Sequence, residues 1–263
     1  MDFTGILLIA GIILLYSFQT LFCTLYTRNY PGREDLASPV FCVIEAVFIV
    51  LLTWALHGFR FHPSGTTVFF GVLNGLTLLG FNLSLMGAGK RGSYAFFNMA
   101  LLYGAILVPM AYSVLFLSET TTLIQWAGVG LMLIAFVLMN WEGKGGQKPK
   151  KGFYLCCAVL FLCNGLYSVF LKMQSMACAQ ESTEMVMITF GLMGIAALIQ
   201  LALREKKNIP RAFRLDKKSL RPLIACLLSA GLAVNGLVLV LPRVNTVVFY
   251  TAENGGVLLL ASL

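Results

Sequence analysis

The chain has 263 residues, and its composition excludes an ordinary soluble domain. Hydrophobic residues make up 59% of it and charged residues 11%, against roughly 45–50% and 25% in soluble domains. The formal net charge of +8 would suit a nucleic-acid partner. Basic loops that face the cytoplasm explain it better in so apolar a chain. We therefore expect the lipid bilayer as a partner and no nucleic acid.

The apolar residues are sorted into long runs. Uncharged apolar stretches of about 18 residues or more are typical of membrane-spanning helices, and 27 of the 30 charged residues lie outside nine such stretches. A signal peptide begins with basic residues, but the only charged residue before the first stretch is Asp2. The stretch is also longer than the apolar part of a signal peptide, so we interpret it as a span. The sequence thus predicts an all-α polytopic membrane protein with spans at 3–26, 39–57, 66–88, 93–117, 122–141, 152–173, 185–203, 222–241 and 246–263.

Part of the fourth span is repeated near the end of the chain. Residues 93–104, SYAFFNMALLYG, have an echo 152 residues later at 245–256, NTVVFYTAENGG. A solvated basic Gly/Lys linker, 143–151, lies between the two copies. We predict a first five-helix repeat at 1–142 and a second repeat at 152–263. An odd number of spans per repeat inverts the second copy, which is the geometry of inverted-repeat transporters.

The second copy holds four predicted spans instead of five. Leu263 aligns with Ala111, so the counterpart of residues 122–141 is absent. We expect nine of ten helices here, in a chain truncated at its C-terminus. The alternative is a partner subunit that supplies the tenth helix.

The junction of the fourth and fifth spans carries a recognisable pattern. Pro109 lies in the fourth span, Glu119 follows its end, and Gln125-x-x-Gly128 opens the fifth. This order resembles the end of the repeat in EamA-type transporters of the drug/metabolite transporter superfamily. The resemblance implies ten spans in two repeats and a central cavity lined chiefly by the first, third and fourth helices of each.

The orientation in the membrane is predicted from basic residues. The loops 27–38, 89–92, 142–151 and 204–221 hold 16 of the 19 Lys and Arg residues. The positive-inside rule places these loops in the cytoplasm and the N-terminus outside. The family resemblance implies the opposite, a cytoplasmic N-terminus.

Two acidic residues within predicted spans are candidates for ion coupling, because ionisable groups in a bilayer are costly and often functional. Glu253 lies in the repeated segment, followed by Asn254-Gly255-Gly256, and is the stronger candidate. Glu45 in the second span is the other. A hydrogen-bonded structural role is the alternative for both.

Neutral polar residues in the spans are candidates for substrate binding. Tyr94 and Asn98 share one helical face, and Tyr250 and Asn254 are the corresponding pair. Amide and phenol groups can donate and accept hydrogen bonds in a cavity, although they can equally join helices. The predicted substrate-binding residues are Gln19, Tyr94, Asn98, Asn164, Tyr250 and Asn254.

These features favour a secondary transporter that moves a small metabolite or drug-like solute by alternating access, coupled to a proton or another cation. We expect an integral protein of a bacterial cytoplasmic membrane, without cofactor or metal, and a homodimer remains open. A non-transporting scaffold or lipid scramblase is the alternative. An intramembrane enzyme is less favoured, because the two histidines, His57 and His62, have no acidic partner close in sequence and no catalytic motif appears.

Overall fold

The computed structural model describes residues 3–118 except 90 and 93, the positions 122, 123, 126–128, 130, 131 and 134, then 149–241 except 206–208, and finally 244, 249–250 and 252–256. Every long element within these residues is helical. The long helices are α1 (Phe3–Asn29), α2 (Glu34–Leu56), α3 (Gly65–Gly89), α4 (Tyr94–Phe116), α6 (Phe153–Ala177), α7 (Ser182–Arg204) and α9 (Lys217–Val240); η1 (Ala179–Glu181) and α8 (Ile209–Ala212) are short.

All seven long helices are long and apolar enough to cross a membrane. They coincide with seven of the nine predicted spans, so the prediction of an all-α membrane protein is confirmed at this level. The other two spans, 122–141 and 246–263, fall largely outside the described residues, as does most of the 143–151 linker. The nine-helix count therefore remains a prediction.

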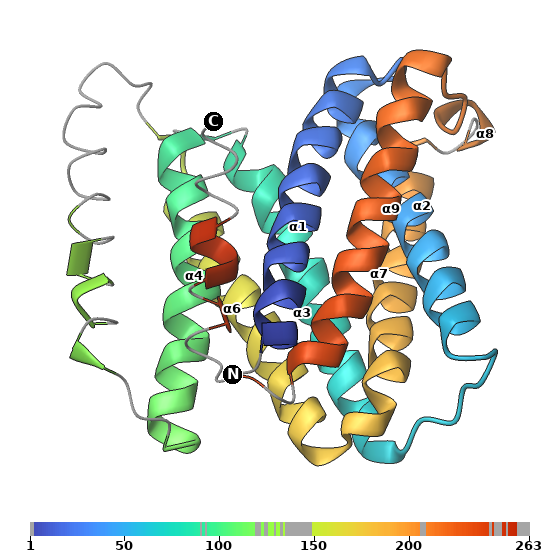
Figure 1. Ribbon diagram of the computed structural model, residues 1–263. Coiled ribbons are helices and arrows are strands. Elements are labelled where there is room, and N and C mark those ends of the chain that lie inside the picture. Colours follow the sequence, from blue (N-terminus) through green and yellow to red (C-terminus); the bar gives the residue numbers. More distant parts are fainter. Residues whose placement is uncertain are drawn as a thin grey trace. The chain divides into compact units, whose positions relative to one another are not determined.

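The chain forms two compact units, 1–76 with 171–244 and 252–263, and 77–170 with 245–251. Each unit combines residues from both predicted repeats. In the first unit α1 packs along α9, and α2 packs against both α7 and α9. Figure 1 shows α1 in blue running beside α9 in orange-red.

Small residues let the helices of the first unit approach one another. Gly194 of α7 faces Ala46 of α2 so closely that a Cβ on the glycine would lie 2.7 Å from the Ala46 Cβ. Gly231 of α9 is likewise covered by Leu52 of α2. Such contacts are the usual basis of helix packing in bilayers, where apolar burial alone gives little driving force.

The second unit is built from the C-terminal part of α3, the helix α4 and most of α6. Its apolar core includes Ala88 of α3 with Phe153, Cys157 and Leu160 of α6. Gly104 of α4 lies directly on the backbone of Phe161 in α6. Both units thus use glycines at helix contacts.

Large apolar side chains also cover the outer faces of the helices. On α1 the exposed ones are Ile6, Leu7, Leu8, Leu14, Phe18, Leu21 and Leu25. An apolar face of this size would favour aggregation in water, but in a bilayer it contacts lipid chains. The surface thus agrees with a membrane-embedded protein.

One helix start outside the apolar region is capped by an acid. The Asp216 carboxylate accepts hydrogen bonds from the Ser219 backbone N–H at 2.9 Å and from its hydroxyl at 2.7 Å, at the start of α9. These bonds favour the ionised carboxylate and lower the pKa of Asp216.

We therefore expect Asp216→Asn to make thermal stability less sensitive to acid. Because the pKa of Asp216 is lowered in the folded state, its contribution is fully present above the ordinary pKa of the group. That contribution is lost as pH falls through the folded value. Asparagine keeps the capping oxygen but does not titrate. Melting temperatures between pH 7 and 3 should fall less in Asp216→Asn than in the parent protein. An identical acid sensitivity of the two proteins would contradict the role of the cap.

Candidate functional site

Glu45 lies at the midpoint of α2. It is 11 positions from either end of the helix, Glu34 and Leu56, which corresponds to about 16 Å along the axis. The residue is 7% exposed. Its neighbour Ala46 makes the contact with Gly194, close to the middle of α7. A buried carboxyl therefore lies where two spans cross near the centre of the apolar layer.

Gln19 of α1 meets Glu45. Its Nε2 atom donates a hydrogen bond to Oε1 of Glu45 over 3.4 Å, a long contact between two of the predicted site residues. The backbone carbonyl of Gln19 accepts a bond from the Cys226 thiol of α9, also at 3.4 Å. Cys23, one turn further along α1, contacts the thiol of Cys226. The structure thus assembles a polar centre from α1, α2 and α9.

The two thiols are members of this centre that sequence reasoning missed. Free cysteine usually packs as a small hydrophobic residue, so a cysteine within an apolar span does not stand out as a polar candidate. Cys23 and Cys226 are 203 positions apart, so no local pattern joins them. Only the packing of α1 along α9 brings them beside Gln19.

Glu253 lies in the described helical segment 252–256, where its side chain is half-buried. Asn254 is half-buried as well. Gly256 of the same segment faces Ile13 of α1: an added Cβ would lie 2.8 Å from the Ile13 side chain. The segment therefore contacts the helix that carries Gln19.

The second unit contains two further candidates, and both bond to backbone carbonyls. Asn164 of α6 donates from Nδ2 to the Leu101 carbonyl of α4 at 2.8 Å. Tyr250 is 4% exposed, and its hydroxyl donates to the Ser168 carbonyl at 3.2 Å. These contacts join helices, the alternative role that the sequence leaves open for amide and phenol groups. The side chains of Tyr94 and Asn98 lie outside the part of the chain that the structure describes.

A polar network at one end of the first unit was not predicted. Nε2 of His57, at the end of α2, lies 3.1 Å from Oε1 of Glu184 in α7. Glu184 is buried and also accepts a bond from Thr183. The partner is 127 positions away, so the expectation that His57 lacks an acid close in sequence holds, although an acid is close in space.

The same end holds a second acid contact. Glu181 accepts bonds from the backbone N–H and the hydroxyl of Ser64, at 2.8 and 2.7 Å. These bonds hold η1 against the start of α3. These polar contacts therefore join the connection between α2 and α3 to the residues that precede α7.

We expect His57 and Glu184 to be coupled in stability. Replacing either residue alone leaves a polar partner unsatisfied, and the effects of groups in contact are not additive. Unfolding of His57→Ala, Glu184→Ala and the double variant in detergent should give a coupling free energy of about 0.5–3 kcal/mol. Additive effects would show that the contact contributes nothing to the stability of this end.

Lys172 is another buried charge, 6% exposed. Its Nζ donates to the backbone carbonyls of Leu241 and Val244, each at 3.1 Å, just after α9. A cation is favourable at the negative end of a helix, where the last carbonyls lack helical partners. Lys172 thus stabilises the end of α9. Among the described residues no group of three or more His, Cys, Asp or Glu side chains is placed to hold a metal ion.

Comparisons with known proteins give a fold and no family. No protein-family model matches the chain, and no curated protein matches it. Fifteen solved chains match. One, described only as the crystal structure of a protein, is 17% identical with a TM-score of 0.69, and the match covers 99% of this chain and 86% of that one. At this identity the likeness concerns the fold alone.

Proposed function

We propose that this protein is a secondary transporter that moves a small metabolite or drug-like solute across the membrane by alternating access. The observation that carries the proposal is the buried Glu45 at the midpoint of α2, in contact with Gln19 of α1. Substrate and coupling-ion sites of secondary transporters lie near the bilayer midplane, at the interface of their repeats.

Reciprocal helix contacts support the proposed inverted repeat. The first span of each half packs on the third span of the other: α1 on α9, and α6 on α3. The second spans α2 and α7 pack on each other through Ala46 and Gly194. Exchanging the two halves therefore leaves these pairings unchanged.

Two further pairs of contacts follow the same exchange. Leu52 of α2 covers Gly231 of α9, and Ile188 of α7 covers Gly71 of α3, where an added Cβ would lie 2.9 Å away. The fourth spans behave alike: Gly104 meets α6, while its counterpart 152 residues later, Gly256, meets α1. These reciprocal contacts within each unit support the proposed inverted repeat, which the resemblance to EamA-type transporters also implies.

Within this proposal Glu45 is the coupling acid. No cationic side chain among the described residues pairs with Glu45, and a charge buried without a partner in an apolar layer is costly. A proton or a transported cation can neutralise it. Gln19, held between Glu45 and Cys226, can then offer its amide to a polar group of the solute. Glu253 remains the alternative acid, on a segment that contacts the same helix.

Flux into proteoliposomes tests the transport function. The purified chain, reconstituted and offered a panel of labelled amino acids, nucleosides, sugars, organic acids and lipophilic cations, should give saturable uptake of at least one class. The matched control is an assay of fluorescent-lipid scrambling in the same vesicles. Lipid scrambling without solute uptake would instead establish the scramblase alternative.

A further inference from the structure

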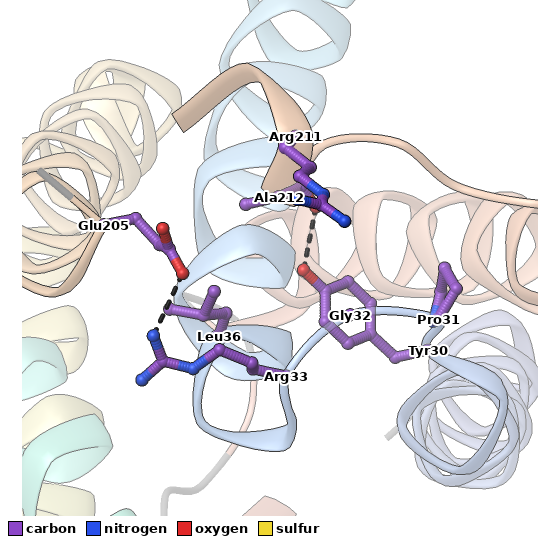
Figure 2. Close-up of a pocket in the computed structure, with 8 residues that line it drawn as sticks. All are labelled: Tyr30, Pro31, Gly32, Arg33, Leu36, Glu205, Arg211 and Ala212. Carbon is purple, nitrogen blue, oxygen red and sulfur yellow. Dashed lines mark hydrogen bonds and ion pairs between the residues drawn. The ribbon is translucent and has the colours of Figure 1, made fainter. Parts of the chain in front are cut away.

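A cavity of about 560 Å³ lies at the opposite end of the first unit from His57. It lies among the α1–α2 connection, the start of α2, the end of α7 and the short α8. Its lining includes Tyr30, Arg33, Leu36, Glu205, Arg211 and Ala212. Figure 2 shows the Tyr30 hydroxyl directed at Ala212, whose carbonyl it bonds at 2.8 Å. This bond closes one side of the cavity between α1 and α8.

Two charges of opposite sign face the cavity without pairing with each other. Glu205 pairs with Arg33 at 3.0 Å, and Arg33 also pairs with Asp35 at 3.0 Å. Arg211 forms no ion pair with any residue that the structure describes. In Figure 2 Glu205 and Arg211 approach from different sides, with Leu36 drawn below Glu205. Only one oxygen of Glu205 bonds to Arg33.

The charges that line the cavity suit a zwitterion better than an anion. Arg33 is compensated by two carboxylates. Among the described residues that line the cavity, this leaves the Arg211 guanidinium as the available cation and the second oxygen of Glu205 as an available acceptor. A guanidinium binds phosphate oxygens well, since its planar N–H groups match their geometry. A carboxylate is the natural acceptor for a primary ammonium group. A ligand with phosphate at one end and ammonium at the other satisfies both.

The position of the cavity selects a lipid as the source of that ligand. It lies just beyond Asn29, where the candidate α1 span ends, and lipid headgroups border the ends of membrane-spanning helices. Tyr30 is an aromatic residue at this boundary, as is common for interfacial anchors. From Tyr30 back along α1 toward its start, the side chains of Leu25 and Leu21 are exposed, one and two turns into the apolar span. Acyl chains can therefore follow α1 while the headgroup occupies the cavity.

We propose that this cavity binds the headgroup of a phospholipid that carries a primary ammonium, a phosphoethanolamine lipid. Arg211 binds the phosphate, and Glu205 accepts hydrogen bonds from the ammonium group. The apolar floor of Leu36 and Ala212 contacts the carbon atoms of the headgroup and its glycerol. The site is separate from Glu45 and does not depend on transport.

The test uses the full chain in detergent, titrated with dihexanoyl lipids while thermal stability is measured. The phosphoethanolamine lipid should stabilise at about tenfold lower concentration than the phosphocholine lipid, whose quaternary nitrogen cannot donate hydrogen bonds. Arg211→Gln should weaken the binding of both lipids by about tenfold, the usual effect of losing one charge-assisted hydrogen bond. Glu205→Gln should remove the difference between the two lipids and leave phosphocholine binding unchanged.

Arg214→Gln is the matched control, because Arg214 is exposed in the same basic region but does not line the cavity. It should bind both lipids as the parent protein does. Equal weakening by Arg211→Gln and Arg214→Gln would reduce the effect to general surface charge and overturn the proposal. Tighter binding of a phosphoglycerol lipid would overturn it too. So would equal stabilisation by free phosphoethanolamine or inorganic phosphate, since the ligand would then be soluble. Arg211→Gln breaks no ion pair among the described residues, so the test stands even if Glu205→Gln is less stable.

Discussion

Glu45→Gln is expected to abolish proton-driven accumulation of the solute while leaving solute exchange across the membrane intact. Glu45 is the buried acid at the centre of α2, and glutamine keeps its size and its hydrogen bond to Gln19 without binding or releasing a proton. With one proton moved per solute, a pH difference of one unit can hold about a tenfold solute gradient. That ratio should fall to about one in the variant.

The measurement is uptake into proteoliposomes with and without a pH gradient, beside counterflow at equal pH on both sides. Glu253→Gln is the matched comparison, since it removes the other candidate acid and changes size as little. If Glu253→Gln loses accumulation and Glu45→Gln keeps it, coupling belongs to Glu253. A protein in which both variants keep pH-driven accumulation has neither acid in its coupling step.

The second large effect concerns packing in the second unit. Gly104→Leu is expected to destabilise the protein by about 3 kcal/mol or more, at the upper end of overpacking effects. A Cβ at position 104 would collide with the backbone carbonyl of Phe161 in α6. Backbone atoms cannot turn away as a flexible side chain can, so α4 and α6 would have to separate.

Thermal melting in detergent measures this effect, with two glycines as comparisons. Gly191→Ala adds a methyl group where no atom lies within 4 Å, so stability should be unchanged or rise by up to roughly 1 kcal/mol. Gly256→Ala should cost less than Gly104→Leu, since its obstacle is the flexible Ile13 side chain. Equal melting temperatures for the Gly104 and Gly191 variants would refute the close contact of α4 with α6.

The span count shows how much of the fold could be predicted from sequence. Long uncharged apolar runs indicate the seven observed helices because the bilayer requires all backbone groups of a span to bond within it. The pairing of those helices could not be predicted in this way. Nothing in the local sequence indicates that α1 packs on α9 or that Gly194 meets Ala46, because such contacts depend on shape along whole helices.

For the candidate site, too, single residues could be predicted from the sequence, but their contacts could not. Glu45 and Gln19 stand out singly, since polar residues in apolar spans are costly and few. Their contact, the addition of Cys226, and the pairing of His57 with Glu184 depend on helices that lie far apart in the chain. Asn164 and Tyr250, predicted to bind substrate, donate bonds to the Leu101 and Ser168 carbonyls that join helices, and their role in substrate binding stays a prediction. Polarity predicts that a residue needs a partner, and the fold decides which one.

Solute flux under a reversible gradient tests the central claim most directly. Proteoliposomes that contain the purified chain are loaded with the solute found in the panel, and flux is measured with the gradient directed outward and then inward, beside protein-free vesicles. Alternating access predicts saturable flux that changes direction with the gradient and is accelerated by unlabelled solute on the opposite side. Flux that rises linearly with concentration and equals that of protein-free vesicles, for every solute of the panel, would contradict a transporter.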